Sequence, residues 1–191
     1  MWARLSRRTK GRVPVNPEDD RLEYQGEHNS AGERDGVGTA RFESGDVYTG
    51  EWKGGAREGH GIYTYECGDV YDGDFSGDLK EGHGNYRSLE GDEYDGEWRA
   101  GMKEGDGVEH HVTGDVYEGQ WQADQKEGHG RYSYPSGNTY SGEWHADLRH
   151  GHMTPDRRGT SCMCMQAHVH PWSARRLVVC ALVHVVVNPS S

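Results

Sequence analysis

GDVYTGEWKGG, residues 45–55, predicts a short strand followed by a turn, and close variants of it return four more times along the chain. The variants occupy residues 68–78, 91–101, 114–124 and 137–147. Their tyrosines are 23 residues apart each time, within a unit that reads Tyr-x-Gly-x-aromatic, a variable segment and then Gly-x-Gly. A fixed period of this length is the sequence signature of a repeat architecture.

Within one unit the residues alternate with the period of a β-strand. Tyr48, Gly50 and Trp52 fall at i, i+2 and i+4, so they share one face of a strand. A second strand alternates in the same way at Gly59, Gly61, Tyr63 and Tyr65. The polar segment 53–57 between them suits a hairpin loop. Each unit is therefore predicted to be a β-hairpin of two strands.

A hairpin of 23 residues cannot bury an aromatic face alone, so the units must stack on one another. We predict an all-β fold, an elongated single-layer antiparallel sheet solenoid with irregular N- and C-terminal tails. Two strands per unit give a rise of roughly 10 Å per repeat. The glycines have a packing role, because an aromatic ring can lie flat on a neighbouring backbone only where no side chain intervenes.

The array is predicted to cover residues 24–152, with units that start at 24, 48, 71, 94, 117 and 140. The last unit is truncated, because Met153 stands where its final glycine is due. We expect residues 1–23 to form a basic, flexible N-terminal arm. Three interpretations of residues 153–191 stay open: a natural tail that caps the array or binds a partner, a strand-rich segment that completes the sheet, or a gene-model artefact.

The Tyr-x-Gly-x-Trp and Gly-x-Gly pattern on a 23-residue period resembles the MORN (membrane occupation and recognition nexus) repeat. One departure from that family recurs in register. Glutamate precedes the first glycine of the pair, where the family usually has histidine, at Glu58, Glu81, Glu104 and Glu127. A histidine often stands between the two glycines instead, at His60, His83 and His129.

The irregular opening at residues 22–52, with its long loop NSAGERDG, and the segment HADLRHGH at residues 145–152 resemble the MORN subunits of the radial spoke head. That resemblance implies a non-catalytic scaffold subunit of the axoneme in motile cilia or flagella, with other radial spoke or cytoskeletal proteins as partners. An alternative is a cytoplasmic MORN adaptor that links a membrane or a cytoskeletal motor to other proteins. A third is the regulatory fragment of a lipid kinase.

The predicted array is strongly acidic, with 27 Asp and Glu residues against 11 Lys and Arg residues. Nucleic-acid binding rewards clustered basic residues, so this balance argues against nucleic acid and against direct docking onto anionic lipid. It favours basic or amphipathic segments of partner proteins. The beginning of the chain, MWARLSRRTKGR, has no apolar stretch typical of a secretory signal, so we expect a cytoplasmic setting with free thiols.

The aromatic face is the best candidate for a binding site, because interfaces favour Tyr and Trp. Its ten residues are Tyr48, Trp52, Tyr71, Phe75, Tyr94, Trp98, Tyr117, Trp121, Tyr140 and Trp144. Two interpretations stay open: the rings form the core, or their exposed edges also line a groove for a partner. The repeat glycines are Gly50, Gly59, Gly61, Gly73, Gly82, Gly84, Gly96, Gly105, Gly107, Gly119, Gly128, Gly130, Gly142 and Gly151.

Catalysis is not predicted, because residues repeated every 23 positions form columns along a rod and not one cluster of dissimilar groups. The recurring acids Asp46, Asp69, Asp92 and Asp115 form such a column, which could at most bind cations weakly. No nucleotide-binding loop is present, so no cofactor is expected. The set Cys162, Cys164, His168 and His170 is too cramped for a usual structural zinc site, and we expect no metal there.

Overall fold

The computed structural model describes residues 23–150 of the 191-residue chain. The expectations for the N-terminal arm, apart from Glu23, for Gly151 and the end of the array at residue 152, and for residues 153–191, including the cysteine and histidine set, lie outside the described residues. No helix in the described part is long and apolar enough to cross a membrane.

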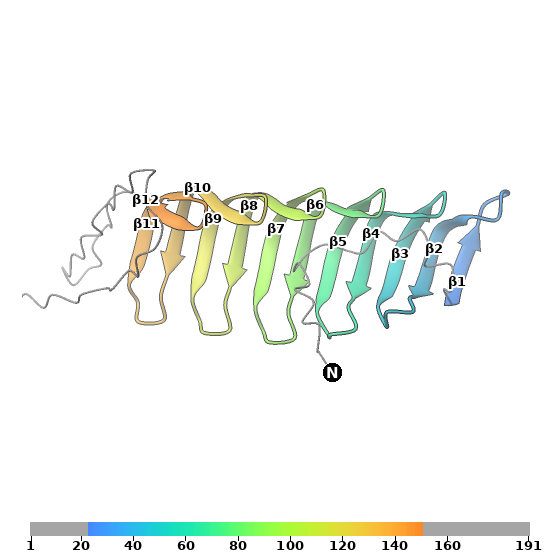
Figure 1. Cartoon of the computed structure of the whole chain (residues 1–191), viewed down its shortest axis with the longest axis horizontal. Coiled ribbons are helices and arrows are strands. Elements are labelled where there is room, and N and C mark those ends of the chain that lie inside the picture. Colours follow the sequence, from blue (N-terminus) through green and yellow to red (C-terminus); the bar gives the residue numbers. More distant parts are fainter. Residues whose placement is uncertain (1–22, 151–191) are drawn as a thin grey trace, which may run out of the picture.

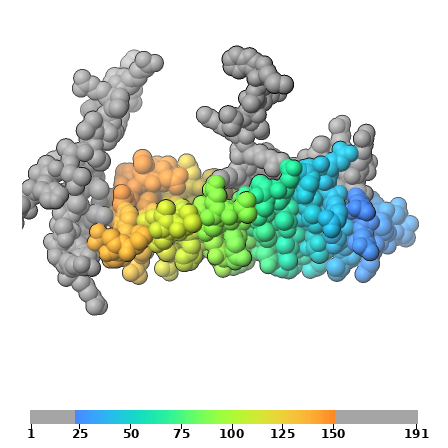
Figure 2. Space-filling model, turned by 90° about the horizontal axis from the view of Figure 1, so that it is seen from below, coloured from blue at the N-terminus to red at the C-terminus, as the bar shows by residue number. Residues whose placement is uncertain are grey.

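Twelve strands form one antiparallel sheet in which the strand order follows the chain from β1 to β12 (Figure 1). The strands are β1 (Glu23–His28), β2 (Arg34–Arg41), β3 (Val47–Lys53), β4 (Ala56–Thr64), β5 (Val70–Ser76), β6 (Leu79–Arg87), β7 (Glu93–Arg99), β8 (Met102–His110), β9 (Val116–Gln122), β10 (Gln125–Ser133), β11 (Thr139–His145) and β12 (Leu148–His150). The described part is a rod (Figure 2), and its main contacts join strands that are adjacent in the sheet. The predicted all-β, single-sheet architecture is confirmed.

Two boundaries differ from the prediction. The segment predicted as a hairpin loop is mostly strand, because only Gly54 and Gly55 separate β3 from β4. Tyr65 was predicted to continue the second strand, but β4 ends at Thr64 and the Tyr65 carbonyl accepts a turn hydrogen bond from the Gly68 amide at 2.9 Å. The turn begins earlier because Gly68, with φ of +94°, closes it back on Tyr65.

A row of glycines crosses the middle of the sheet, one on each strand from β1 to β11. Gly50 faces Gly61, which faces Gly73, which in turn faces Gly84, and the pairing continues to Gly142. A Cβ atom on Gly61 would lie 2.4 Å from the Tyr48 hydroxyl oxygen, closer than real contacts allow. The row therefore admits no side chain, and each tyrosine ring lies flat on the backbone.

The first glycine of each Gly-x-Gly pair has a different role. Gly59 has φ of +62°, in the left-handed region that glycine adopts readily. It lies at a shift of strand register between Gly50 and Trp52, and the Glu51 carboxylate accepts a hydrogen bond from the next amide, that of His60, at 3.2 Å. This bulge bends the hairpin tip, so that Trp52 lies edge-on against Tyr48.

The core is a ladder of edge-to-face rings along the inner face of the sheet. The centroid of Tyr48 lies 5.0 Å from that of Trp52 in its own hairpin and 5.1 Å from that of Phe75 in the next. Each such pair contributes about 0.5–1.5 kcal/mol beyond the area it buries. The Tyr48 hydroxyl donates to the Glu51 carbonyl at 2.9 Å, and Trp52 Nε1 donates to the Gly38 carbonyl at 3.1 Å, so the polar ends of the rings are also satisfied.

Candidate functional site

The ten residues of the predicted aromatic face are all buried, with at most 6% of any of them exposed. They occupy the interior between the sheet and the bent hairpin tips, and among them Tyr94 and Trp98 line a cavity that is described below. A partner-binding role for these ten side chains stays a prediction. Most of the surface that a partner can reach is made by other residues.

Three members of the aspartate column, Asp46, Asp69 and Asp92, join one repeat to the next. Asp46 Oδ1 accepts a hydrogen bond from the Glu66 amide at 2.8 Å, and its Oδ2 accepts one from the Tyr63 hydroxyl at 2.8 Å. Asp69 repeats the arrangement one unit later with the Leu89 amide and the Tyr86 hydroxyl. These carboxylates therefore hold backbone turns together. Within residues 23–150, no group of three or more His, Cys, Asp or Glu side chains is placed to hold a metal ion.

The glutamate column makes a second set of links at the hairpin tips. Glu58 accepts a hydrogen bond from the Gly77 amide at 3.0 Å, and Glu81 accepts one from the Ala100 amide at 2.9 Å. Glu104 and Glu127 bind the amides of Ala123 and Ala146 in the same way. Much of the acidity of the array is thus structural, because repeated carboxylates satisfy amides of the following repeat.

A basic column at the same 23-residue period was missed in the sequence. Its members are Arg34, Arg57, Lys80, Lys103, Lys126 and Arg149. Their charged groups lie over the aromatic ladder, with the Arg34 guanidinium carbon 4.3 Å from the Trp52 ring centroid and Lys80 Nζ 4.4 Å from that of Trp98. Such cation–π contacts cover the rings that a single-layer sheet would otherwise leave open. The spacing alone could have revealed the column, since six of the eleven basic residues of the array fall on it.

The members of this column are stabilised in different ways. Arg57 Nε lies 2.9 Å from Asp78 Oδ1. Lys80 is completely buried, and its Nζ has no hydrogen-bond partner in the described structure. Burial lowers the pKa of Lys80 to about 7, with smaller opposing effects from Asp124 and Asp69 that raise it. Burial thus favours the neutral form of the Lys80 amine.

A second aromatic row runs beside the ladder and is interrupted at one place. Phe42, Tyr63, Tyr65 and Tyr86 form a chain of ring contacts, and Tyr132 and Tyr134 form another. At the 23-residue period, three positions between these two groups correspond to aromatic residues of the other repeats, but they carry Ser88, Glu109 and His111. We call this gap the row break.

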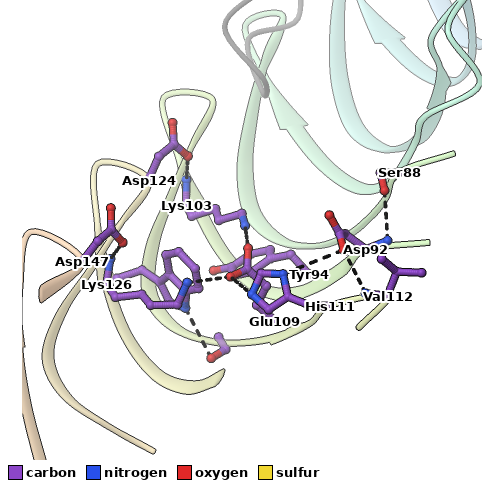
Figure 3. Close-up of polar contacts among 12 residues, drawn as sticks. Ser88, Asp92, Tyr94, Lys103, Glu109, His111, Val112, Asp124, Lys126 and Asp147 are labelled. Carbon is purple, nitrogen blue, oxygen red and sulfur yellow. Dashed lines mark hydrogen bonds and ion pairs between the residues drawn. The ribbon is translucent and has the colours of Figure 1, made fainter. Parts of the chain in front are cut away.

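Charged side chains converge at the row break (Figure 3). Glu109 lies 2.6 Å from Lys103 Nζ through its Oε1, and 2.7 Å from Lys126 Nζ through its Oε2. His111 Nε2 lies 3.2 Å from the same Oε2. Burial alone would raise the pKa of Glu109, but the two lysines outweigh it and hold the pKa below its usual value. Glu109 is therefore an anion shared by two cations and fully engaged within the fold.

A cavity of about 90 Å³ opens at the row break, beside this cluster. Its walls are Tyr86, Ser88, Asp92, Glu93, Tyr94, Trp98, Lys103, Glu109 and Asp124. The cavity exists because Ser88 and Glu109 stand where other repeats place bulkier tyrosine rings. Neither residue was singled out from the sequence, although comparison of the repeats position by position would have shown both departures.

The MORN repeat profile matches six segments of the chain, which together span more than half of it. The segments are residues 30–47, 48–70, 71–92, 94–116, 117–139 and 140–152. The chain belongs to the MORN-repeat family. No curated protein matches this MORN chain significantly. A solved structure similar to it is the TCP domain of SAS-4 (dCPAP) in complex with a proline-rich motif of Ana2 (dSTIL) from Drosophila melanogaster. The two chains are 14% identical, the match covers 69% of this chain and 85% of that chain, and the TM-score is 0.40. A likeness of that extent supports no conclusion about function.

Proposed function

We propose that this MORN protein is a non-catalytic scaffold subunit of the axonemal radial spoke head. MORN repeats imply a protein-interaction or scaffold role, and the family is typically non-enzymatic. The observation that carries the scaffold role is the unbroken sheet from β1 to β12. The axonemal placement is supported by the resemblance of residues 22–52 and 145–152 to radial spoke subunits.

The links between repeats suit a rod that transmits force. Neighbouring hairpins share backbone hydrogen bonds, an edge-to-face ring contact and a glutamate link at the tip, as between Tyr48 and Phe75 and between Glu58 and Gly77. Asp46, Asp69 and Asp92 add a link at the other end. No flexible connection interrupts these contacts in residues 23–150. A rod with this many links per repeat transmits force along its length without a hinge.

The outer face of the sheet supports the expectation of basic or amphipathic partners. Asp72 and Asp95 lie there about half exposed, beside His60 and His83 at 3.1 and 3.2 Å. These carboxylates are not used by the aspartate or glutamate links. Basic segments of other spoke or cytoskeletal proteins are therefore the proposed partners of this face.

Proximity labelling in a flagellated cell tests the proposal. A copy fused to a biotin ligase is expressed, and the labelled neighbours are identified. The proposal predicts that spoke-head and central-pair proteins dominate. Enrichment of motor tails and membrane proteins instead would contradict it and would favour the alternative, a cytoplasmic MORN adaptor that links a membrane or a cytoskeletal motor to other proteins.

A further inference from the structure

We propose that the cavity at the row break receives the phenol side chain of a tyrosine from a partner protein. This inference rests on the proposed scaffold function and specifies the chemistry of one contact. It follows from what the neighbouring repeats place at the same position, from the walls of the cavity and from the charges around it.

The repeats themselves show which group is missing. Asp46 and Asp69 each bind an amide of the next repeat through one carboxylate oxygen and a tyrosine hydroxyl through the other. Asp92 keeps the first half of this arrangement, because its Oδ1 accepts the Val112 amide at 2.9 Å (Figure 3). The tyrosine position that would serve Asp92 is occupied by Glu109. Asp92 Oδ2 accordingly has no hydrogen-bond donor among residues 23–150, and Asp92 lines the cavity.

The walls of the cavity suit an aromatic ring. Tyr86, Tyr94 and Trp98 line it, and their rings already contact one another, Tyr94 edge-on to Trp98 and Tyr86 tilted against Trp98. The volume of about 90 Å³ is several times what one water molecule requires, roughly 10–15 Å³. Asp92 is about one-third exposed, so the cavity can be reached from outside.

The charges around the cavity favour a hydrogen-bond donor. An anionic side chain would be repelled by Asp92, Glu93 and Asp124, whereas Lys103 is already paired with Glu109. Glu109 is not the expected hydrogen-bond acceptor for the ligand, because both of its oxygens already bind lysines. A phenol carries no charge, fills the volume with a ring and can donate its proton to Asp92 Oδ2. Phenylalanine would lack that donor.

The first experiment titrates the purified full chain with 4-methylphenol, the side-chain analogue of tyrosine, and follows backbone amides by NMR. A ligand of this size is expected to bind with a Kd on the order of 1 mM. The predicted result is a saturable shift centred on Ser88, Asp92 and Val112. Toluene, the analogue of phenylalanine, is the matched ligand control and should bind at least about threefold more weakly, because it cannot donate to Asp92.

The variant Ser88→Tyr is the matched protein control, since it fills the cavity with a side chain that other repeats carry at this position. The folded variant should lose the saturable response to 4-methylphenol. The proposal is overturned if the wild-type chain gives no saturable shift, if toluene binds equally well, or if the variant still binds. Those results would leave the scaffold proposal standing, because proximity labelling judges it separately.

Discussion

Replacing Lys80 by Met removes a buried charge while keeping most of the side-chain volume, and the effect should depend on pH. The folded-state pKa of Lys80 is lowered to about 7 from 10.5. Between these two values the unfolded chain binds more protons at this site, so the free energy of unfolding of the wild-type protein rises with pH. Integrating the difference from pH 7 to pH 9 gives a gain of about 2 kcal/mol that the Lys80→Met variant cannot show.

Urea denaturation of both proteins at pH 7, 8 and 9, followed by tryptophan fluorescence, measures this effect. All other titrating groups are common to the two chains, so the difference between their free energies of unfolding isolates Lys80. The variant's advantage at pH 7 should shrink by about 2 kcal/mol by pH 9. Lys103→Met is the control: it strips Glu109 of one partner, so it should cost about 2 kcal/mol.

A pH-independent difference between wild type and Lys80→Met would refute this reasoning. It would mean that the amine stays protonated throughout, held by the rings around it. The Trp98 and Tyr71 centroids lie 4.4 and 4.7 Å from Nζ, so cation–π attraction is the competing effect. The experiment therefore decides whether desolvation or the aromatic cage controls this buried lysine.

Three further predictions test the packing and the charges of the fold. Gly84→Ala should lower the free energy of unfolding by about 3 kcal/mol in the same denaturation assay, because its Cβ would overlap a tyrosine ring. Gly77→Ala, with open space around it, should lower the free energy of unfolding by only about 1 kcal/mol. Equal losses would refute the steric role of the glycine row. Asp46→Ala should cost about 3 kcal/mol, because the Tyr63 hydroxyl and an amide lose their acceptor, and a change below 0.5 kcal/mol would contradict the linking role. The lowered pKa of Glu109 contributes stability above its unfolded pKa of 4.5. The wild-type protein should therefore lose more stability than Glu109→Gln as the pH falls below about 5. Parallel pH profiles of the two proteins would refute the lowered pKa of Glu109.

The architecture was predictable because the period and the alternation constrain it jointly. Tyr48, Gly50 and Trp52 can share a face only on a strand, and a 23-residue hairpin has no other way to bury that face than to stack. The exact ends of the strands were not predictable in the same way. Tyr65 continues the alternation in the sequence, but the turn hydrogen bond from Gly68 takes its carbonyl out of the ladder.

The site was harder to predict, because identical residue types serve different roles. Asp46 resembles a surface acid in the sequence, yet it is 1% exposed and binds the following repeat. The basic column escaped notice because the aromatic rings were expected to form the core themselves or to line a groove for a partner, and not to be covered by basic side chains of the same chain. The row break depends on what Ser88 and Glu109 lack, which only comparison with the other repeats and the three-dimensional arrangement make visible.

The scaffold role is tested most directly by fractionating flagella that carry a tagged copy of the protein. The flagella are stripped with detergent and then washed with rising salt. The account predicts that the protein stays with the detergent-stripped axoneme and leaves only together with other spoke proteins. Release into the detergent-soluble membrane fraction, or failure to enter the flagellum, would contradict it.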